Sequence, residues 1–419
     1  MLPTHKIFIR LSLLMCAVCL FMLCCTPPAG REAATQVSAQ TVSNTQSEIP
    51  PILKRKAAIG TKEEQNKVYS IFTELQHAIA QNPKEYRNRL QLAQLYMLEA
   101  RATGEHGYYY PAALKVINDI LAEEPNKDVI FGATSLKASV YLSLHKFAEA
   151  KELARYATSL NGFNALIYGS LVDAHVELGE YKEGIEMADK MVSIRPDLRS
   201  YSRVSYLREI HGDLDGAIEA MLEAVKAGYP GYEETAWTRL TLGGLYEQKG
   251  DLASARFQYE TAIAERPNYP FATAALAGIA VKEGKTEEAI AMLHQATNVI
   301  PEVGFYVQLL TIYQEQGDTQ NYDKTLGMVF EMLADDEAKG HNMGLEYAKL
   351  HLHHTGKLDE ALNYAQKEYN ERPNNIDVNQ LMAEIHYAKG DMAQAKQFLK
   401  AAQRTNNQHP DLLAIASKL

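Results

Sequence analysis

The sequence of 419 residues contains only four cysteines, and all four lie within the first 25 positions. The remainder of the chain therefore forms no disulfide and offers no thiol nucleophile. Positive charge is also scarce, because 42 lysines and arginines face 52 acidic residues and the net charge is −10. A chain without an excess of basic residues neutralises few phosphates, so we do not expect nucleic acid as a partner.

Motifs of the common enzyme classes are missing as well. Residues 278–286 come close to a phosphate-binding loop, but they have one residue too many between the glycines and would follow a helix instead of a strand. The metal-like cluster of the sequence is a group of histidines in which His351 and His354 share a helical face, and no third ligand stands at a fixed spacing. We predict no enzyme, no cofactor and no metal, and we interpret these histidines as a solvated helix end.

The first 25 residues predict an export signal. Basic residues precede an apolar run from Leu11 to Leu23, which is too short for a comfortable membrane span. Cys24 and Cys25 end this run, and their position resembles the lipidation site of a bacterial lipoprotein signal, although the preceding residues depart from the usual pattern. Lipidation, ordinary cleavage and an uncleaved anchor stay open, and each places the chain outside the cytoplasm, at the periplasmic face of a bacterial membrane.

Two further regions precede the most regular part of the chain. Residues 26–60 are rich in small and polar residues without a helical period, which predicts a flexible tether because little apolar surface could offset the entropy of ordering. Residues 61–164 predict degenerate helix pairs, with an insertion near 104–111 that contains three consecutive tyrosines. We interpret these tyrosines either as an aromatic contact site or as packing over a junction between helix pairs.

A period of about 34 residues organises the rest of the sequence. Seven glycines that read as turns stand 33, 38, 34, 33, 39 and 34 residues apart, and a small residue follows five positions after six of them. These turns are at Gly179, Gly212, Gly250, Gly284, Gly317, Gly356 and Gly390. Such a period indicates stacked helix pairs, because a single pair cannot bury its apolar face alone.

Residues 236–267 carry the pattern most completely, with Leu242 and Gly243 in the first helix and Ala255 and Tyr259 in the second. This arrangement resembles the tetratricopeptide repeat (TPR). The resemblance implies an all-α fold, namely a right-handed α-solenoid of about eight to nine helix pairs. We expect the regular array at 165–410 and a C-terminal capping helix at 411–419. With its export signal, the chain resembles exported bacterial TPR lipoproteins.

The resemblance also implies a groove lined by fixed positions of the first helices. Eight acidic and two basic residues occupy such positions from Ala165 onward. We therefore expect protein partners with basic or aromatic segments, held by charge complementarity and stacking. The predicted groove residues are Asp173, Glu177, Tyr206, Glu209, Trp237, Glu247, Gln248 and Glu315.

The favoured hypothesis is a non-enzymatic scaffold for protein–protein interaction in the bacterial cell envelope. It would support the assembly of envelope, pilus or secretion complexes, and its membrane contact would be the N-terminal lipid or signal anchor. One alternative is a structural repeat protein that assembles with itself. Another is an enzyme that processes cell-wall carbohydrate, or a regulator of one, which would need a close pair of carboxylates such as Glu209 and Glu247.

Overall fold

The computed structural model describes residues 49–419, and every regular element within them is helical. The first helices of nine consecutive pairs are α2 (Tyr86–Thr103), α4 (Lys127–Ser143), α6 (Ala165–Glu177), α8 (Leu198–Ile210), α10 (Glu233–Lys249), α12 (Pro270–Lys282), α14 (Val303–Gln316), α16 (Gly344–Leu350) and α18 (Ile376–Ala388). Their partners are α3 (His106–Ala122), α5 (Phe147–Leu160), α7 (Tyr181–Ile194), α9 (Leu214–Ala227), α11 (Leu252–Glu265), α13 (Thr286–Val299), α15 (Thr319–Ala338), α17 (Leu358–Glu371) and α19 (Met392–Ala402). Helix α1 (Lys62–Gln81) precedes the pairs, and α20 (Pro410–Ala416) covers the last one.

The pair α10–α11 shows why this sequence pattern folds as a helical hairpin. Gly250 ends α10 in the left-handed region at φ +83°, and the Asp251 side chain caps α11 by accepting from the backbone amide of Ser254. Gly243 has no room for a Cβ, because the ring of Tyr259 lies directly against it. Ala255 is fully buried in the same contact. The prediction of an all-α repeat fold is confirmed.

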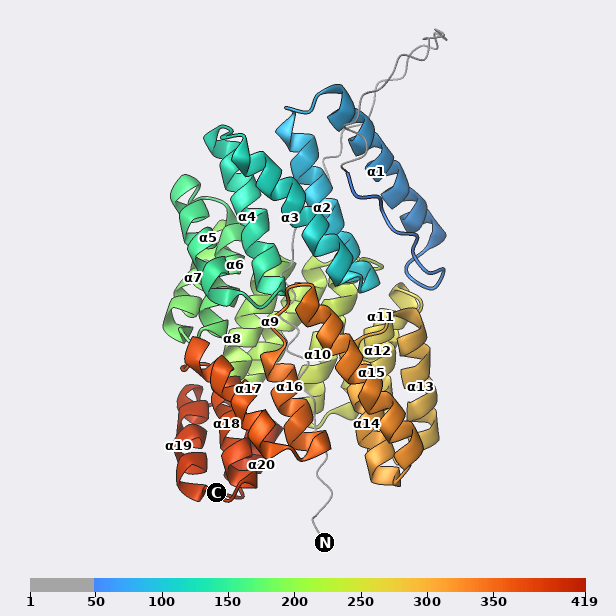
Figure 1. Cartoon of the computed structure of the whole chain (residues 1–419), viewed down its shortest axis with the longest axis vertical. Helices are drawn as coiled ribbons and strands as arrows, with labels where there is room; N and C mark the ends of the chain where they lie inside the picture. Colours follow the sequence, from blue (N-terminus) through green and yellow to red (C-terminus); the bar gives the residue numbers. More distant parts are fainter. Residues whose placement is uncertain (1–48) are drawn as a thin grey trace.

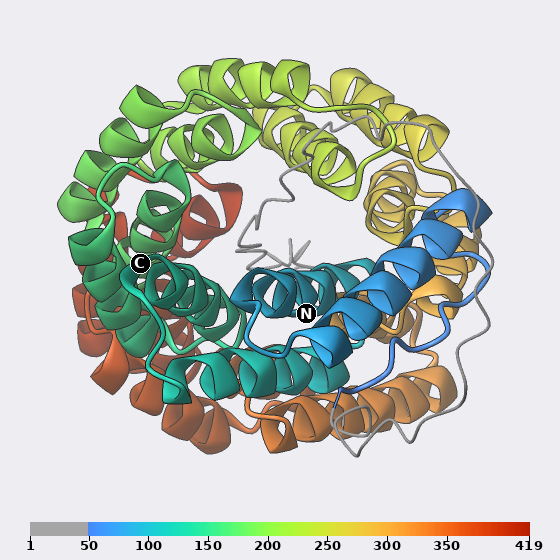
Figure 2. The ribbon, with the colours of Figure 1, turned by 90° about the horizontal axis from the view of Figure 1, so that it is seen from above.

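The helices curve into a ring (Figure 2). Successive first helices touch one another, as in α2 with α4, α4 with α6, and α6 with α8. On a curved stack, the elements that approach each other most closely are those on the shorter, inner radius. The first helices therefore form an inner layer and the second helices an outer one. We call the surface of the inner layer that points toward the ring axis the inner face.

The solenoid returns on itself after one turn of the ring. Helices α4 to α7 lie above α16 to α20 (Figure 1), and polar bonds join the two levels. Glu177 pairs with Arg372, the Tyr181 hydroxyl accepts from the backbone amide of Ile376, and His145 bonds the carbonyl of Asn342. The residues joined by these bonds are 195 to 197 apart in the chain. We call this line of contacts the seam.

Residues 49–60 form an ordered segment before α1, which we call the strap. Leu53 donates its backbone amide to the hydroxyl of Tyr109 at 2.9 Å, and Arg55 pairs with the buried Glu99 of α2. Ile59 packs against Val299 and Ile300 of the opposite level. The expected tether therefore does not extend to residue 60, because these contacts offset the entropy of ordering. The rest of the tether and the export signal with Cys24 and Cys25 lie outside the described residues.

The expected insertion at 104–111 is instead a tight turn followed by the beginning of a helix. Gly104 ends α2 in the left-handed region, and α3 begins two residues later. Tyr109 and Tyr110 are buried in the core of the first pair, and the hydroxyl of Tyr108 donates to the carbonyl of Pro51 in the strap. Of the two interpretations of the tyrosines, packing over a junction is the one that the structure supports.

Candidate binding surface on the inner face

Four of the eight predicted groove residues form bridges between neighbouring first helices. Arg203 of α8 donates from Nε to Asp173 of α6 at 2.8 Å. The amide of Gln248 on α10 donates to Glu209 of α8, also at 2.8 Å. Lys282 of α12 pairs with Glu247 of α10. We call this row the polar ladder. It ties consecutive first helices together along the inner layer.

The polar ladder changes the electrostatics that the sequence suggested. Asp173 and Glu247 each face a cation of the next repeat, and the Tyr259 hydroxyl also donates to Glu247. The charges of these two predicted groove acids are therefore neutralised within the chain. Glu209 and Glu247, which a carbohydrate-processing site would need, are each bonded to a partner of their own.

Glu177 has a role in the seam and not only at the end of α6. Its carboxylate pairs with Arg372, which also pairs with Glu368 at 2.9 Å, and all three side chains are less than a tenth exposed. The backbone carbonyl of Glu177 accepts from the amide of Asn375 at 2.9 Å. A buried ion pair of this kind selects one arrangement more than it adds net stability.

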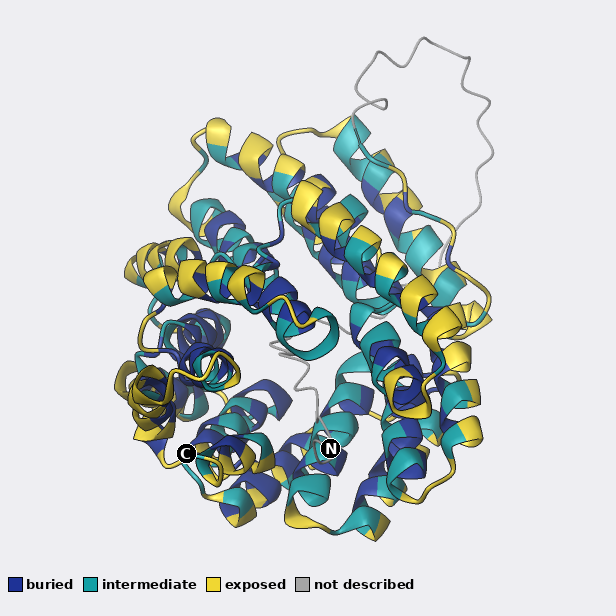
Figure 3. Cartoon of the chain, turned by 60° about the horizontal axis from the view of Figure 1, so that its bottom comes forward, coloured by how far each residue is buried: buried dark blue, intermediate teal, exposed yellow. Residues whose placement is uncertain are grey.

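The remaining predicted positions are not fully buried. Tyr206 on α8 and Trp237 on α10 are half-buried, and Glu315 near the end of α14 is exposed. Exposed positions gather on the outward sides of the helices and on the loops, whereas the sides that face the interior are buried or intermediate (Figure 3). Whether these residues bind a partner stays a prediction.

Three partly buried carboxyl groups, those of Glu302, Asp336 and Glu346, lie near one another at the level of α14 to α16. Burial raises the pKa of Glu302 to about 7, and the negative charge of Asp336 on α15 adds to the shift. Burial also raises the pKa of Asp336. One carboxylate oxygen of Glu346 on α16 is buried without a hydrogen-bond partner. The predicted groove residues include none of these three carboxyl groups, because Glu302 lies in a loop and Asp336 on a second helix.

The histidines near 351 are packed, which corrects their interpretation as a solvated helix end. They lie in η2 (His351–Thr355), a π-helical turn that continues α16. His351 is buried and stacks on Tyr364 of α17. Burial lowers the pKa of His353 and of His354 to about 4. Among residues 49–419, no three His, Cys, Asp or Glu side chains are grouped so that they could hold a metal ion.

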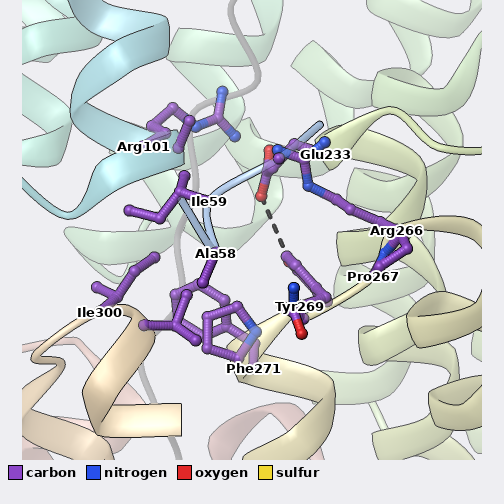
Figure 4. A pocket seen from close by; sticks show the side chains of 14 residues that line it. Ala58, Ile59, Arg101, Glu233, Arg266, Pro267, Tyr269, Phe271 and Ile300 are labelled. Carbon is purple, nitrogen blue, oxygen red and sulfur yellow. Dashed lines mark hydrogen bonds between the residues drawn. The ribbon is translucent and has the colours of Figure 1, made fainter. Parts of the chain in front are cut away.

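A small pocket lies where the strap meets the second half of the ring (Figure 4). Ile59 and Ile300 form part of its wall, and Glu233 enters from the beginning of α10. Tyr269 donates its hydroxyl to Glu233 at 3.4 Å. Nε and Nη1 of Arg101 are buried there without a hydrogen-bond partner.

Comparison with known proteins agrees with the repeat geometry. One tetratricopeptide repeat family model matches residues 246–310 and 352–419, and a second tetratricopeptide repeat model matches 211–273. The chain is a tetratricopeptide-repeat protein. TPR arrays support a role as a protein-interaction scaffold, and proteins of this kind are generally non-enzymatic. No curated protein matches this TPR chain.

Solved structures of TPR proteins resemble it at low identity. A monomeric mutant of IFIT1 with Gppp-AAAA has a TM-score of 0.51 and 13% identity over 81% of this chain and 77% of that one. The human IFIT1 dimer with PPP-AAAA has a TM-score of 0.50 and 14% identity over 82% and 78%. PilF of Pseudomonas aeruginosa has a TM-score of 0.40 and 16% identity over 49% and 93%. At these identities the likeness concerns the fold alone.

Sequence reasoning missed the partners of Asp173 and Glu177. Arg203 and Arg372 do not stand at groove positions, and Asn375 lies in a loop between repeats. The one sequence feature that points toward the seam is His145, which stands where other repeats have a turn glycine. Its φ is +58°, and its ring bonds the carbonyl of Asn342 across the seam. Among the helices of residues 49–419, none has the length and apolarity needed to cross a membrane.

Proposed function

We propose that the inner face of this TPR ring binds extended segments of partner proteins and holds them together without catalysing a reaction. The observation that carries the proposal is the continuous row of first helices, tied by the polar ladder from α6 to α12. Such a row offers one long, preorganised surface, which lowers the cost of ordering a bound segment. Proteins with TPR arrays serve as interaction scaffolds, which agrees with this role.

The proposed contact residues are those of the inner layer whose side chains remain accessible. Trp237 and Tyr206 would stack on aromatic or cationic side chains of the partner, and Glu315 would attract a basic residue. Because the polar ladder neutralises other acids, aromatic contact should contribute more to affinity than net charge. The net charge of −10 argues against a nucleic-acid ligand of the kind held by IFIT1.

We further propose that the ring works at the periplasmic face of a bacterial membrane, where it supports an envelope, pilus or secretion complex. This part rests on the amino-acid pattern of residues 1–25 and on Cys24 and Cys25 as possible lipid sites. The strap lies against the ring through its bonds to Tyr109 and Glu99, so an N-terminal anchor would hold the ring at the strap.

Affinity capture from detergent-solubilised envelopes tests the proposal. The inner variant combines Trp237→Ala on α10 with Glu315→Lys on α14, since Glu247→Lys would break the polar ladder. The outer control combines Phe257→Ala on α11 with Glu331→Lys on α15, both exposed on second helices. We expect a defined set of envelope proteins with the wild type and the outer control, and a loss of about tenfold or more with the inner variant.

Two results would contradict the proposal. Equal recovery of the partners by the inner variant and by the outer control would place the contact elsewhere. Recovery of the full-length protein from the soluble fraction alone would overturn its attachment to the membrane. Circular dichroism of both variants checks that the helical content is unchanged.

A further inference from the structure

The seam repeats one kind of contact at several places. Turns within helix pairs of the upper level lie on loops between pairs of the lower level. An added Cβ at Gly104 would overlap the side chain of Ile300, and the ring of His145 bonds the carbonyl of Asn342 at 2.9 Å. Farther along, the turn at Gly179 lies on Asn374. The repeat length thus brings successive turns onto successive loops.

Two of the seven turn glycines also allow a turn of the upper level to lie directly on a loop of the lower level. An added Cβ at Gly179 would overlap the backbone carbonyl of Asn374, and one at Gly212 would lie 2.5 Å from the backbone oxygen of Asn406. Among residues 49–419, nothing lies within 4 Å of a Cβ added at any of the other five turn glycines, among them Gly284. All seven have a positive φ, which is +75° at Gly179 and +77° at Gly284.

The seam differs chemically from the packing between repeats. Neighbouring repeats share clusters of buried alanine, leucine and aromatic side chains. Across the seam, the apolar and ring contacts are Ile376 with Val172 and Val176, Ile300 against Gly104, and His341 with the ring of Tyr110 at 6.0 Å. The polar contacts are hydrogen bonds and the Glu177–Arg372 pair, whose arginine also lies over the ring of Phe147 at 4.9 Å. Water can replace hydrogen bonds and ion pairs when an interface separates, whereas exposed apolar surface has no such compensation. The ring is therefore easiest to open along the seam.

We propose that the seam is a reversible clasp at which the closed ring opens into an extended solenoid. Opening would expose the inner face from the side, so that a partner segment need not enter along the ring axis. The clasp itself follows from the seam contacts, and only its use in loading a partner rests on the proposed function. Closure after binding would then retain the segment.

Hydrogen–deuterium exchange of the wild-type protein is the first test. The backbone amide of Ile376 is bonded across the seam to Tyr181, and that of Asn342 to Leu144. We expect these two amides to exchange about tenfold or more faster than amides in the middle of α10 and α12, because only the seam must open. Equal protection of both groups would show that the ring opens only on global unfolding, and would overturn the clasp.

A matched pair of glycine variants is the second test, with small-angle X-ray scattering and exchange as readouts. Gly179→Ala and Gly284→Ala carry the same left-handed backbone cost, but only the first also overlaps the opposite level. We expect Gly179→Ala to increase the radius of gyration and to speed exchange at residues 372–378, with unchanged helical content. Gly284→Ala should lower the melting temperature without either effect. Equal radii of gyration for the two variants would overturn the proposal.

Two further variants control for a folding defect at the turn of Gly179. Arg372→Met removes the cation of the buried pair without touching a turn, and Gly212→Ala strains the seam at another point. Both should open the seam as Gly179→Ala does, and a closed ring in both would overturn the proposal. None of these measurements includes a partner. If these measurements show that the seam opens but the capture experiment recovers no partner, only the proposed function is contradicted.

Discussion

At the scale of the residue, the partly buried carboxyl group of Glu302 makes the stability of this TPR ring depend on pH. The ordinary pKa of a glutamate is 4.5, whereas burial and Asp336 raise that of Glu302 to about 7 in the folded chain. The folded state then holds a proton that the unfolded state releases. The resulting stability is fully present below about pH 4.5 and is lost as the pH rises through 7.

Replacing this one carboxyl group should therefore remove part of the pH dependence. Between pH 5 and pH 8, we expect the wild type to lose about 1–2 kcal/mol of unfolding free energy that Glu302→Gln retains, after allowance for solvent screening. Urea denaturation at the two pH values measures the difference. Glu331→Gln, at an exposed position of α15, serves as the control. A wild type and Glu302→Gln variant with the same pH dependence would contradict the assignment.

At the scale of the element, the strap shows how a segment without secondary structure is held. The hydroxyl of Tyr109 accepts from the amide of Leu53, that of Tyr96 donates to the carbonyl of Pro50, and that of Tyr108 donates to the carbonyl of Pro51. Tyrosines of α2 and α3 thus satisfy the backbone of the strap, which makes no ladder of its own. The aromatic cluster is therefore an attachment point within the chain.

Tyr109→Phe removes one of these attachments without changing the packing of the ring. Because the amide of Leu53 then lacks its partner, we expect the strap to lose about 1–3 kcal/mol of local stability. Amides of residues 49–60 should exchange faster, while those of α2 and α3 stay protected. Tyr229→Phe, at a side chain that is 75% exposed, is the control. Unchanged protection of the strap would show that its other contacts suffice.

At the scale of the whole molecule, closure of the ring changes how far the destabilising effect of a local defect extends along the repeats. In an open solenoid each repeat contacts only its neighbours, so a local defect affects mainly adjacent helices. Here the loop before α18 bonds the turn after α6, through Arg372, Asn375 and Ile376. A defect near the C-terminus should therefore also reach residues almost 200 positions earlier.

Phe398→Ala tests this coupling. The side chain is 8% exposed on α19 and stacks on His386, so its truncation should cost about 3–5 kcal/mol. We expect faster hydrogen exchange at residues 177–181 as well as in α18. Phe257→Ala on the exposed side of α11 should change neither region. If the effect of Phe398→Ala stopped at α16, the seam would not couple the two levels.

The sequence by itself determined the repeat unit, because the constraints involved are local. Gly250 and Asp251 set the turn, and Gly243 against Tyr259 sets the approach of the two helices, all within one stretch of about 34 residues. Stacking then repeats one contact between neighbours, so the helix pairs and their order could be predicted. The groove positions followed from the same regularity, although their function stays a prediction.

Only the tertiary structure decided where the ring closes and what the groove acids bond to. The twist from one repeat to the next is small, but it adds up over nearly six repeats before residues 195 to 198 positions apart meet. No local sequence pattern specifies the twist accumulated over these repeats, and a slight change of twist would separate Glu177 from Arg372. For the same reason, the second role of Gly179 could not be distinguished in the sequence from the single role of Gly284.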